Sequence, residues 1–232
     1  LSKFQVKDKY KPFFDGIIKD NLNNIAFVKV LQKKYKHIGA FQTRNIPHFG
    51  HEKIIERLLE VCDHVVVNPV IGPKKKGDVT IECLRSIYEY LSKNKYNKKI
   101  SFNPILANMF YAGPREAMHH TLIRQRIGFH HFTVGRDHAG AEGAYQPKMA
   151  SNLLKKNIKK FRINVLVHAG AAFCSKCNKV ILIGDCSHSV HEMVDISGED
   201  FRSSLAKKRI FELADGQMQR QLRKINGAIF EK

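Results

Sequence analysis

The chain has 232 residues, 43% of them hydrophobic and 26% charged, which excludes a disordered chain and fits a globular protein with one sizeable core, or with a larger and a smaller domain. No apolar run reaches the length of a membrane span, and no basic segment followed by an apolar core opens the chain, so we expect a cytoplasmic protein with no membrane partner. The formal charge of +19 fits either a polyanionic ligand or a lysine-rich surface, and no stripe of basic and aromatic residues favours a nucleic-acid strand as that ligand.

Five elements are expected in the first half of the chain, in the order strand, helix, strand, helix and strand. Apolar residues recur on one side of the first helix, at Ile54, Ile55, Leu58 and Leu59. The β-branched run Val65–Val67 marks the second strand. The expected ranges are 37–42 for the first strand, 64–68 for the second, 80–91 for the second helix and 101–106 for the third strand.

The second half of the chain continues this alternation. Gly113-Pro114 predicts the start of a helix that runs through Arg126, and Gly128 is its expected C-terminal stop. Further strands are expected over 131–135 and 162–167. Alternation over this length predicts an α/β fold, with a Rossmann-like parallel sheet and helices on both of its faces. Such sheets bind ligands at the carboxyl ends of their strands.

The segment 42–51, Q-T-R-N-I-P-H-F-G-H, stands where the first strand ends and the first helix begins. Backbone N–H groups at a helix start attract anions, and His48 and His51 can both face a phosphate chain there. Gly50 allows a nucleotide to approach the backbone closely. Arg44 offers a planar fork that matches a tetrahedral oxyanion. Taken alone, the H-x-G-H spacing could equally be a histidine pair that caps a helix.

A second polar loop, over 135–140, follows a later strand and is expected beside the first loop at the same edge of the sheet. Arg136 can pair with phosphate there. Gly140 frees the backbone to offer an N–H group to an anion. In isolation, Arg136-Asp137-His138 would more often be a surface ion pair. Beside the first motif, we interpret the loop as part of one anion site.

Four segments in order along the chain resemble ATP sulfurylase, a family of the H-x-G-H nucleotidyltransferases. They are Q-T-R-N-x-x-H-x-x-H at 42–51, P-x-x-G-x-x-K-x-G-D at 69–78, Y-A-G-P-R-E-A at 111–117 and V-G-R-D-H-A-G at 134–140. Residues 196–198, Ile-Ser-Gly, also fit, and the resemblance covers roughly 36–205. It implies that a sulfate oxygen attacks the α-phosphorus of ATP in line, which yields adenylyl sulfate and pyrophosphate.

The resemblance also implies roles for the matched residues. Sulfate would be held by Gln42, Arg44 and the backbone of Ala139. The catalytic residues would be Thr43, Arg44, Asn45, His48 and His51. ATP would be contacted by Gln42, Thr43, Arg44, Asn45, His48, His51, Gly135, Arg136, Asp137 and His138. Mg²⁺ would accompany ATP, chelated mainly by the nucleotide.

Two departures from the family pattern bear on the acceptor. Phe49-Gly50 stands where the family usually has Arg-Ala, and residues 141–147 differ from the usual Tyr-Asp-Ala-Gln continuation. An alternative hypothesis therefore keeps nucleotidyl transfer but changes the acceptor or the nucleotide, for example to a phosphorylated metabolite and CTP. A homo-oligomer and a fusion to an adenylylsulfate kinase domain are both compatible with the sequence.

The five cysteines fall into two groups. Cys62 and Cys83 lie in apolar, helical surroundings and are expected to be buried thiols. The others are clustered with histidines at a spacing typical of a closed structural zinc site, whose expected ligands are Cys174, Cys177, Cys186 and either His188 or His191. The alternative is three reduced thiols in a loop.

For the whole chain we expect a nucleotidyltransferase catalytic domain over 1–167 and a small zinc-containing C-terminal subdomain, with helices, over 168–232. Its first helix is expected after Ser197, which with Asp200 has capping-box spacing.

Overall fold

A five-stranded parallel sheet forms the centre of the molecule. The computed structural model describes residues 11–72, 77–135, 138–139, 145–146, 148–225 and 229–231, with side chains from residue 15 onward. The sheet consists of β1 (Ile38–Phe41), β2 (His64–Val67), β4 (Ile100–Phe102), β6 (His131–Val134) and β7 (Asn164–Val167). Every neighbouring pair is parallel, so the predicted parallel sheet is confirmed.

The spatial order of the strands is β4-β2-β1-β6-β7. The chain therefore builds outward from β1 through β2 and β4, and then crosses back to continue on the other side of β1 with β6 and β7. The order reverses between β1 and β6. In open α/β sheets, the crevice at the carboxyl ends of the strands on either side of such a reversal is the usual ligand site.

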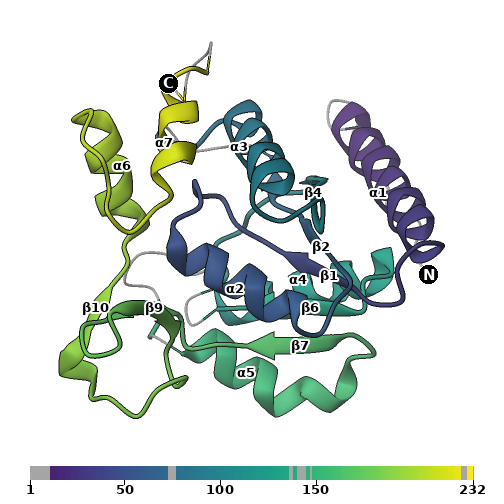
Figure 1. The fold of residues 1–232 in the computed structure, drawn as a ribbon. Helices are drawn as coiled ribbons and strands as arrows, with labels where there is room; N and C mark the ends of the chain where they lie inside the picture. Colours follow the sequence, from purple (N-terminus) through teal and green to yellow (C-terminus); the bar gives the residue numbers. More distant parts are fainter. Residues whose placement is uncertain are drawn as a thin grey trace.

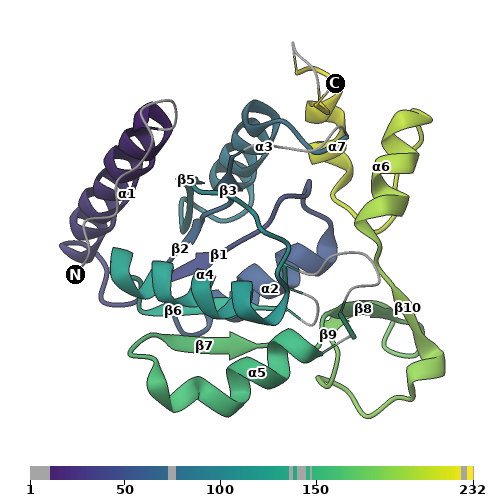
Figure 2. The same ribbon diagram turned by 180° about the vertical axis from the view of Figure 1, so that it is seen from behind.

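Helices cover both faces of the sheet, as the strand–helix alternation predicts. Figures 1 and 2, seen from opposite sides, show α2 and α4 on opposite faces of the sheet. The helices flanking the sheet are α1 (Lys11–Gln32), α2 (Phe49–Leu59), α3 (Ile81–Asn94), α4 (Pro114–Ile127) and α5 (Met149–Asn157), the last continued by a 3-10 turn, Ile158–Lys160.

Side chains of the strands alternate between two apolar clusters, one on each face. In β2, Val65 and Val67 pack with α2 and α3, whereas Val66 packs with α1, α4 and α5. This alternation follows from the period of two in a strand and explains why both faces need helices. Cys62 and Cys83 are buried in the first cluster, which confirms that they are buried thiols.

Local side-chain and glycine chemistry defines several helix ends, among them the predicted ends at Gly128 and Ser197. The Thr80 side chain accepts a hydrogen bond from the backbone N–H of Cys83 at the start of α3. Gly128 ends α4 in the left-handed conformation, with φ of 110°, which a side chain would make costly. The Ser197 hydroxyl accepts from the N–H groups of Glu199 and Asp200 and caps α6 (Gly198–Ala206).

The prediction of a single strand over 101–106 is wrong. Strand β4 ends at Phe102, and Ile105–Leu106 form a separate strand, β5, which pairs in parallel with β3 (Val70–Ile71) in a two-stranded sheet. Pro104 stands between the two strands. It has no N–H group to donate to a ladder, and it restricts the residue before it, so it breaks the strand there.

The long helix α1 is an element that the sequence pattern does not predict. Its surface contradicts a simple amphipathic pattern, because polar Asn24 is 2% exposed while Ile18, Leu22 and Val30 are 58%, 61% and 64% exposed. The Asn24 amide donates to the Pro104 carbonyl oxygen, 3.1 Å away, and so ties α1 to the segment between β4 and β5. The buried side of this helix thus combines a polar contact with apolar packing, since Val28 is fully buried in the second cluster.

The C-terminal region adds a small antiparallel sheet and two helices. Its strands are β8 (Ala171–Cys174), β9 (Lys179–Leu182) and β10 (Met193–Asp195), with the order β10-β8-β9. A 3-10 turn, Val190–Glu192, precedes β10, and α7 (Gly216–Leu222) follows α6. Phe201 of α6 and Met218 of α7 belong to the same apolar cluster as α2 and α3.

The division of the chain into a catalytic domain and a C-terminal subdomain between residues 167 and 168 stays a prediction. Within the described ranges, no helix combines the length and apolarity that a bilayer crossing needs.

Candidate active site and metal group

A cavity of about 260 Å³ opens at the carboxyl ends of β1 and β6, where the strand order reverses. The loop after β1 lines it with Gln42, Thr43, Arg44, Asn45 and His51. The described part of the loop after β6 lines it with His138 and Ala139. The two predicted loops therefore meet in one cavity, because both leave the sheet beside the switch point. Arg136, Asp137 and Gly140 lie outside the described residues.

The histidine pair of the first loop caps α2 and at the same time approaches the cavity. His48 Nδ1 accepts the N–H of Gly50 at 3.1 Å, and His51 Nδ1 accepts the N–H of His48 at 3.4 Å, which completes a capping box. Since both Nδ1 atoms accept, the ring proton of each neutral histidine resides on Nε2. His51 Nε2 lies 3.4 Å from Thr43 Oγ1 and donates toward it, and the tilted ring of His48 lies against that of His51, with 3.9 Å between the ring centres.

Burial keeps these imidazoles uncharged. Burial lowers the pKa of His48 to about 4. Burial, with the nearby His48 and His168, lowers the pKa of His51 well below its ordinary value. Both rings are therefore neutral N–H donors at pH 7, and of the pair only His51 lines the cavity. Positive charge has to come from other residues.

Arg44 brings a positive charge to the cavity wall. It is exposed, and its guanidinium lies 5.7 Å from the centre of the Tyr111 ring and 3.4 Å from the Tyr111 hydroxyl. Tyr111 belongs to the Y-A-G-P-R-E-A segment, so this contact joins two of the motifs. A guanidinium on an aromatic face keeps its forked N–H groups available for an oxyanion.

Asn45 is held by a residue from the far end of the chain. Its Oδ1 accepts a hydrogen bond of 3.0 Å from Arg202 on α6, and a Cβ on Gly198 would lie 3.4 Å from its Nδ2. Arg202 was not predicted from the sequence, although it lies four residues after Gly198 of the Ile-Ser-Gly segment. The helix that follows this segment therefore brings a second guanidinium to the first loop.

The second loop closes the cavity beside α4. Ala139 has a left-handed backbone, with φ of 56°, and its carbonyl oxygen accepts the N–H of Gly113 at 2.9 Å. Gly135 lies against His168, since a Cβ there would be 3.2 Å from the imidazole of His168. His138 is partly exposed at the cavity wall, and desolvation, with His120, Arg124 and His168, lowers its pKa well below the ordinary value.

His120 and His168 are site residues that the sequence did not indicate. His120 Nδ1 lies 3.1 Å from Gln42 Nε2 and 2.9 Å from His138 Nε2. Burial lowers the pKa of His168 to about 4, and its Nδ1 accepts the N–H of Gly170. The four-residue spacing of Glu116 and His120 on a predicted helix is a signal that could have identified His120.

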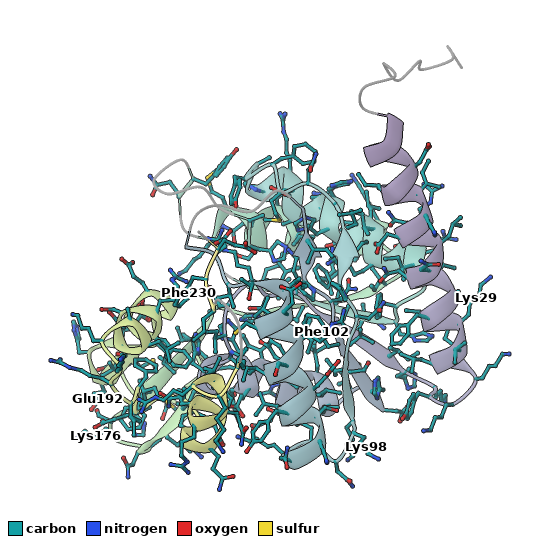
Figure 3. All side chains as sticks on the ribbon, turned by 90° about the horizontal axis from the view of Figure 1, so that it is seen from above. Lys29, Lys98, Phe102, Lys176, Glu192 and Phe230 are labelled. Carbon is teal, nitrogen blue, oxygen red and sulfur yellow. The ribbon has the colours of Figure 1, made fainter. Side chains whose placement is uncertain are left out.

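The clustered cysteines form a compact group with a single histidine. The ligand atoms of Cys174, Cys177, Cys186 and His188 all lie within 4.8 Å of one another. His188 Nδ1 is 3.2 Å from the Sγ of Cys177 and 3.4 Å from that of Cys174. The group therefore favours His188 over His191. At the outer edge of this region, Lys176 and Glu192 lie side by side, 3.9 Å apart (Figure 3).

The chemistry of this group suits a divalent metal. The backbone N–H of Cys177 lowers the pKa of the Cys174 thiol to about 7. The neighbouring Cys174 sulfur in turn raises the pKa of Cys177 to about 11. Adjacent thiolates repel each other, and a cation between them removes this penalty. Three sulfurs and one imidazole nitrogen are a tetrahedral donor set typical of structural zinc.

Comparison with known families gives a direct match. The ATP-sulfurylase family model matches residues 27–211 of the chain. Among curated proteins, the chain is 39% identical over 202 residues to a sulfate adenylyltransferase of Ignicoccus hospitalis, which covers 87% of the chain and 52% of that protein. It is 38% identical over 177 residues to the corresponding protein of Staphylothermus marinus, with 76% of the chain and 46% of that protein covered. The chain thus spans about half the length of the curated relatives it matches.

Comparison with solved structures supports the fold alone. A hexameric APS kinase from Thiobacillus denitrificans superposes with a TM-score of 0.63 at 11% sequence identity. The match covers 86% of the present chain and 38% of the other. At this identity, the likeness describes the arrangement of the strands and helices and carries no information on activity.

Proposed function

Because the chain belongs to the ATP-sulfurylase family, we propose that it transfers the adenylyl group of ATP to sulfate and releases pyrophosphate. The observation that carries this proposal is the meeting of the two motif loops in one cavity at the switch point of the sheet. The 38–39% identity to curated sulfate adenylyltransferases supports the same reaction.

The proposed reaction depends on positioning and on charge stabilisation. Sulfate is already an anion at neutral pH, so its oxygen needs no general base before it attacks the α-phosphorus. Arg44, the Gln42 amide and the backbone N–H of Ala139 would hold the sulfate. Donors that suit the phosphate oxygens and the departing pyrophosphate are the Nε2–H of His51 and the side chains of Thr43 and Asn45, backed by His48. Gly135, Arg136, Asp137 and His138 would complete the ATP site.

Mg²⁺ would bind with ATP, held mainly by the phosphates, and would neutralise part of their charge. We also propose that Cys174, Cys177, Cys186 and His188 hold a structural Zn²⁺. Two observations support this zinc site: its donors are three sulfurs and one imidazole nitrogen, and these four atoms all lie within 4.8 Å of one another. A closed site of four protein ligands leaves no position for substrate, so the zinc would stabilise the fold and take no part in the chemistry.

The proposed activity is tested by pyrophosphate exchange. The chain should exchange labelled pyrophosphate into ATP only when sulfate is present, and molybdate, a sulfate mimic, should trigger continuous ATP cleavage. The Arg44→Ala variant should lose at least about a hundredfold in kcat/KM, because it removes a charge-assisted contact to the oxyanion.

The control arm replaces ATP with CTP and sulfate with phosphorylated metabolites. Sulfate-independent exchange, or a preference for CTP, would replace sulfate adenylyl transfer by the alternative acceptor or nucleotide. The 141–147 segment follows the second loop and departs from the family pattern, so both the acceptor and the nucleotide have to be tested.

A further inference from the structure

A buried pair on α4 joins the two loops of the cavity from behind. Glu116 and His120 are 2% and 1% exposed, and neither lines the cavity. His120 Nδ1 lies 3.1 Å from Nε2 of Gln42, which comes from the first loop. The same nitrogen lies 2.9 Å from Nε2 of His138, which comes from the second loop. One ring nitrogen thus contacts a side chain from each motif.

Glu116 lies beside the other ring nitrogen of His120, Nε2. Its Oε1 accepts the N–H of Phe110 at 2.8 Å, and its Oε2 accepts the N–H of Ala112 at 2.9 Å. Burial alone would raise the pKa of Glu116, but the neighbouring His120 and hydrogen bonds from the N–H groups of Phe110 and Ala112 hold that pKa below its ordinary value. His120 Nε2 lies 3.4 Å from Oε1. A carboxylate only accepts hydrogen bonds, so it favours the tautomer with the proton on Nε2.

This tautomer leaves a lone pair on His120 Nδ1, facing Gln42 and His138. Burial keeps His120 uncharged by lowering its pKa, so a second ring proton is not available. The lone pair can accept one N–H of the Gln42 amide and the Nε2–H of His138. The opposite tautomer would point an N–H group at the Gln42 amide nitrogen, which is itself a donor, and would turn an imidazole lone pair toward a carboxylate. Glu116 on one side of the ring and Gln42 on the other therefore both favour the tautomer with the proton on Nε2.

The tautomer has consequences inside the cavity. With its NH₂ group anchored on His120, Gln42 keeps its second amide hydrogen for a ligand that accepts, as an oxyanion does. His138 donates its proton from Nε2, so its Nδ1 is an acceptor. A phosphate oxygen is itself an acceptor and cannot bind there, whereas a hydroxyl or an amine of a nucleoside can.

We propose that Glu116 and His120 are positioning residues that fix Gln42 as a hydrogen-bond donor to the acceptor anion and His138 as a hydrogen-bond acceptor for the nucleoside part of ATP. The assignment of these two ligands rests on the proposed function; the tautomer itself does not. His120 acts through Gln42 and His138, and Glu116 acts through His120.

A matched pair of variants isolates the Nδ1 lone pair. His120→Asn and His120→Leu have similar size and shape, and both lose the contact with Glu116. The Asn side-chain oxygen can take the place of Nδ1 as an acceptor, whereas Leu offers none. We expect the Leu variant to show a KM for sulfate about tenfold above that of the Asn variant, which is the effect of one lost hydrogen bond. Thermal melting of both variants provides the folding control.

The second measurement needs neither substrate nor turnover. Long-range proton–nitrogen NMR spectra of the full chain, labelled with ¹⁵N-histidine, identify the tautomer of each ring, and the His120→Asn variant assigns His120 by the loss of its signals. A protonated Nε2 with an unprotonated Nδ1 supports the inference. A protonated Nδ1, or equal KM values for the Asn and Leu variants, overturns it. Absence of sulfate-dependent turnover would end the proposed function, while the NMR result would still decide the tautomer.

Discussion

Buried histidines determine the charge of the cavity at the level of single residues. Burial lowers the pKa of His48 and of His168 to about 4, and that of His51 and His138 well below the ordinary value. These rings act as neutral hydrogen-bonding groups, so the charge that compensates an oxyanion comes from guanidinium groups such as Arg44.

His64 permits a test of this effect away from the cavity. It is 3% exposed, Nε2 contacts the Ser101 hydroxyl at 2.8 Å, and its ring stacks on Tyr35. Burial, with the charge of Lys34, lowers its pKa to about 4. The unfolded chain takes up this proton below about pH 6.5, whereas the folded chain does so only near pH 4. The contribution of His64 to stability is therefore complete above pH 6.5 and is lost as the pH falls toward 4.

The His64→Gln variant should show a weaker pH dependence than the parent chain. Gln can still contact Ser101 but does not titrate. Between pH 7 and pH 4, the free energy of unfolding of the parent should fall by roughly 1–3 kcal/mol more than that of the variant. Urea unfolding at a series of pH values measures this difference, and parallel curves for the two proteins would contradict the prediction.

At the scale of elements, the small C-terminal sheet supports the start of α2. A Cβ on Gly50 would lie 3.2 Å from the Cβ of Ala171 in β8, so the sheet packs directly against the turn that carries the histidine pair. Further along α2, Nη2 of Arg57 lies 2.8 Å from each carboxylate oxygen of Asp185, which follows β9. Disruption of the cysteine group would therefore reach the cavity through α2.

The zinc proposal predicts a clear difference between two neighbouring histidines. Metal analysis should find about one zinc per chain in the parent and in His191→Ala, and much less in His188→Ala, because only His188 lies within reach of the three sulfurs. Removal of the zinc with a chelator should lower the melting temperature of the parent. Equal zinc content in the two variants would exclude His188 as the fourth ligand.

For the whole molecule, the charge of +19 predicts non-specific attraction to polyanions that is separate from the cavity. Retention on immobilised duplex DNA should be measurable at about 50 mM salt and should fall by orders of magnitude near 200 mM. The Arg44→Ala variant should be retained like the parent, because one charge among many contributes little. Retention that resists salt, or that depends on Arg44, would instead indicate a nucleic-acid site in the cavity.

The sequence by itself determined the features that depend on neighbours along the chain. The strand-to-helix loop at Gln42–His51, the stop at Gly128 and the cap at Ser197 follow from residue types at short spacing. The cluster of three cysteines follows from their spacing in the same way. Such signals need only local backbone chemistry. The same chemistry, read at Pro104, could have shown that the strand expected over 101–106 is interrupted.

Only the tertiary structure decided which distant residues meet. The order β4-β2-β1-β6-β7 brings the loops after β1 and β6 to one cavity, and it results from long-range strand pairing that no local pattern specifies. Pairing and packing over long separations also brought Arg202 to Asn45 and His120 to Gln42, and selected His188 over His191. Burial, which lowers the pKa of the site histidines, likewise exists only once the chain has folded.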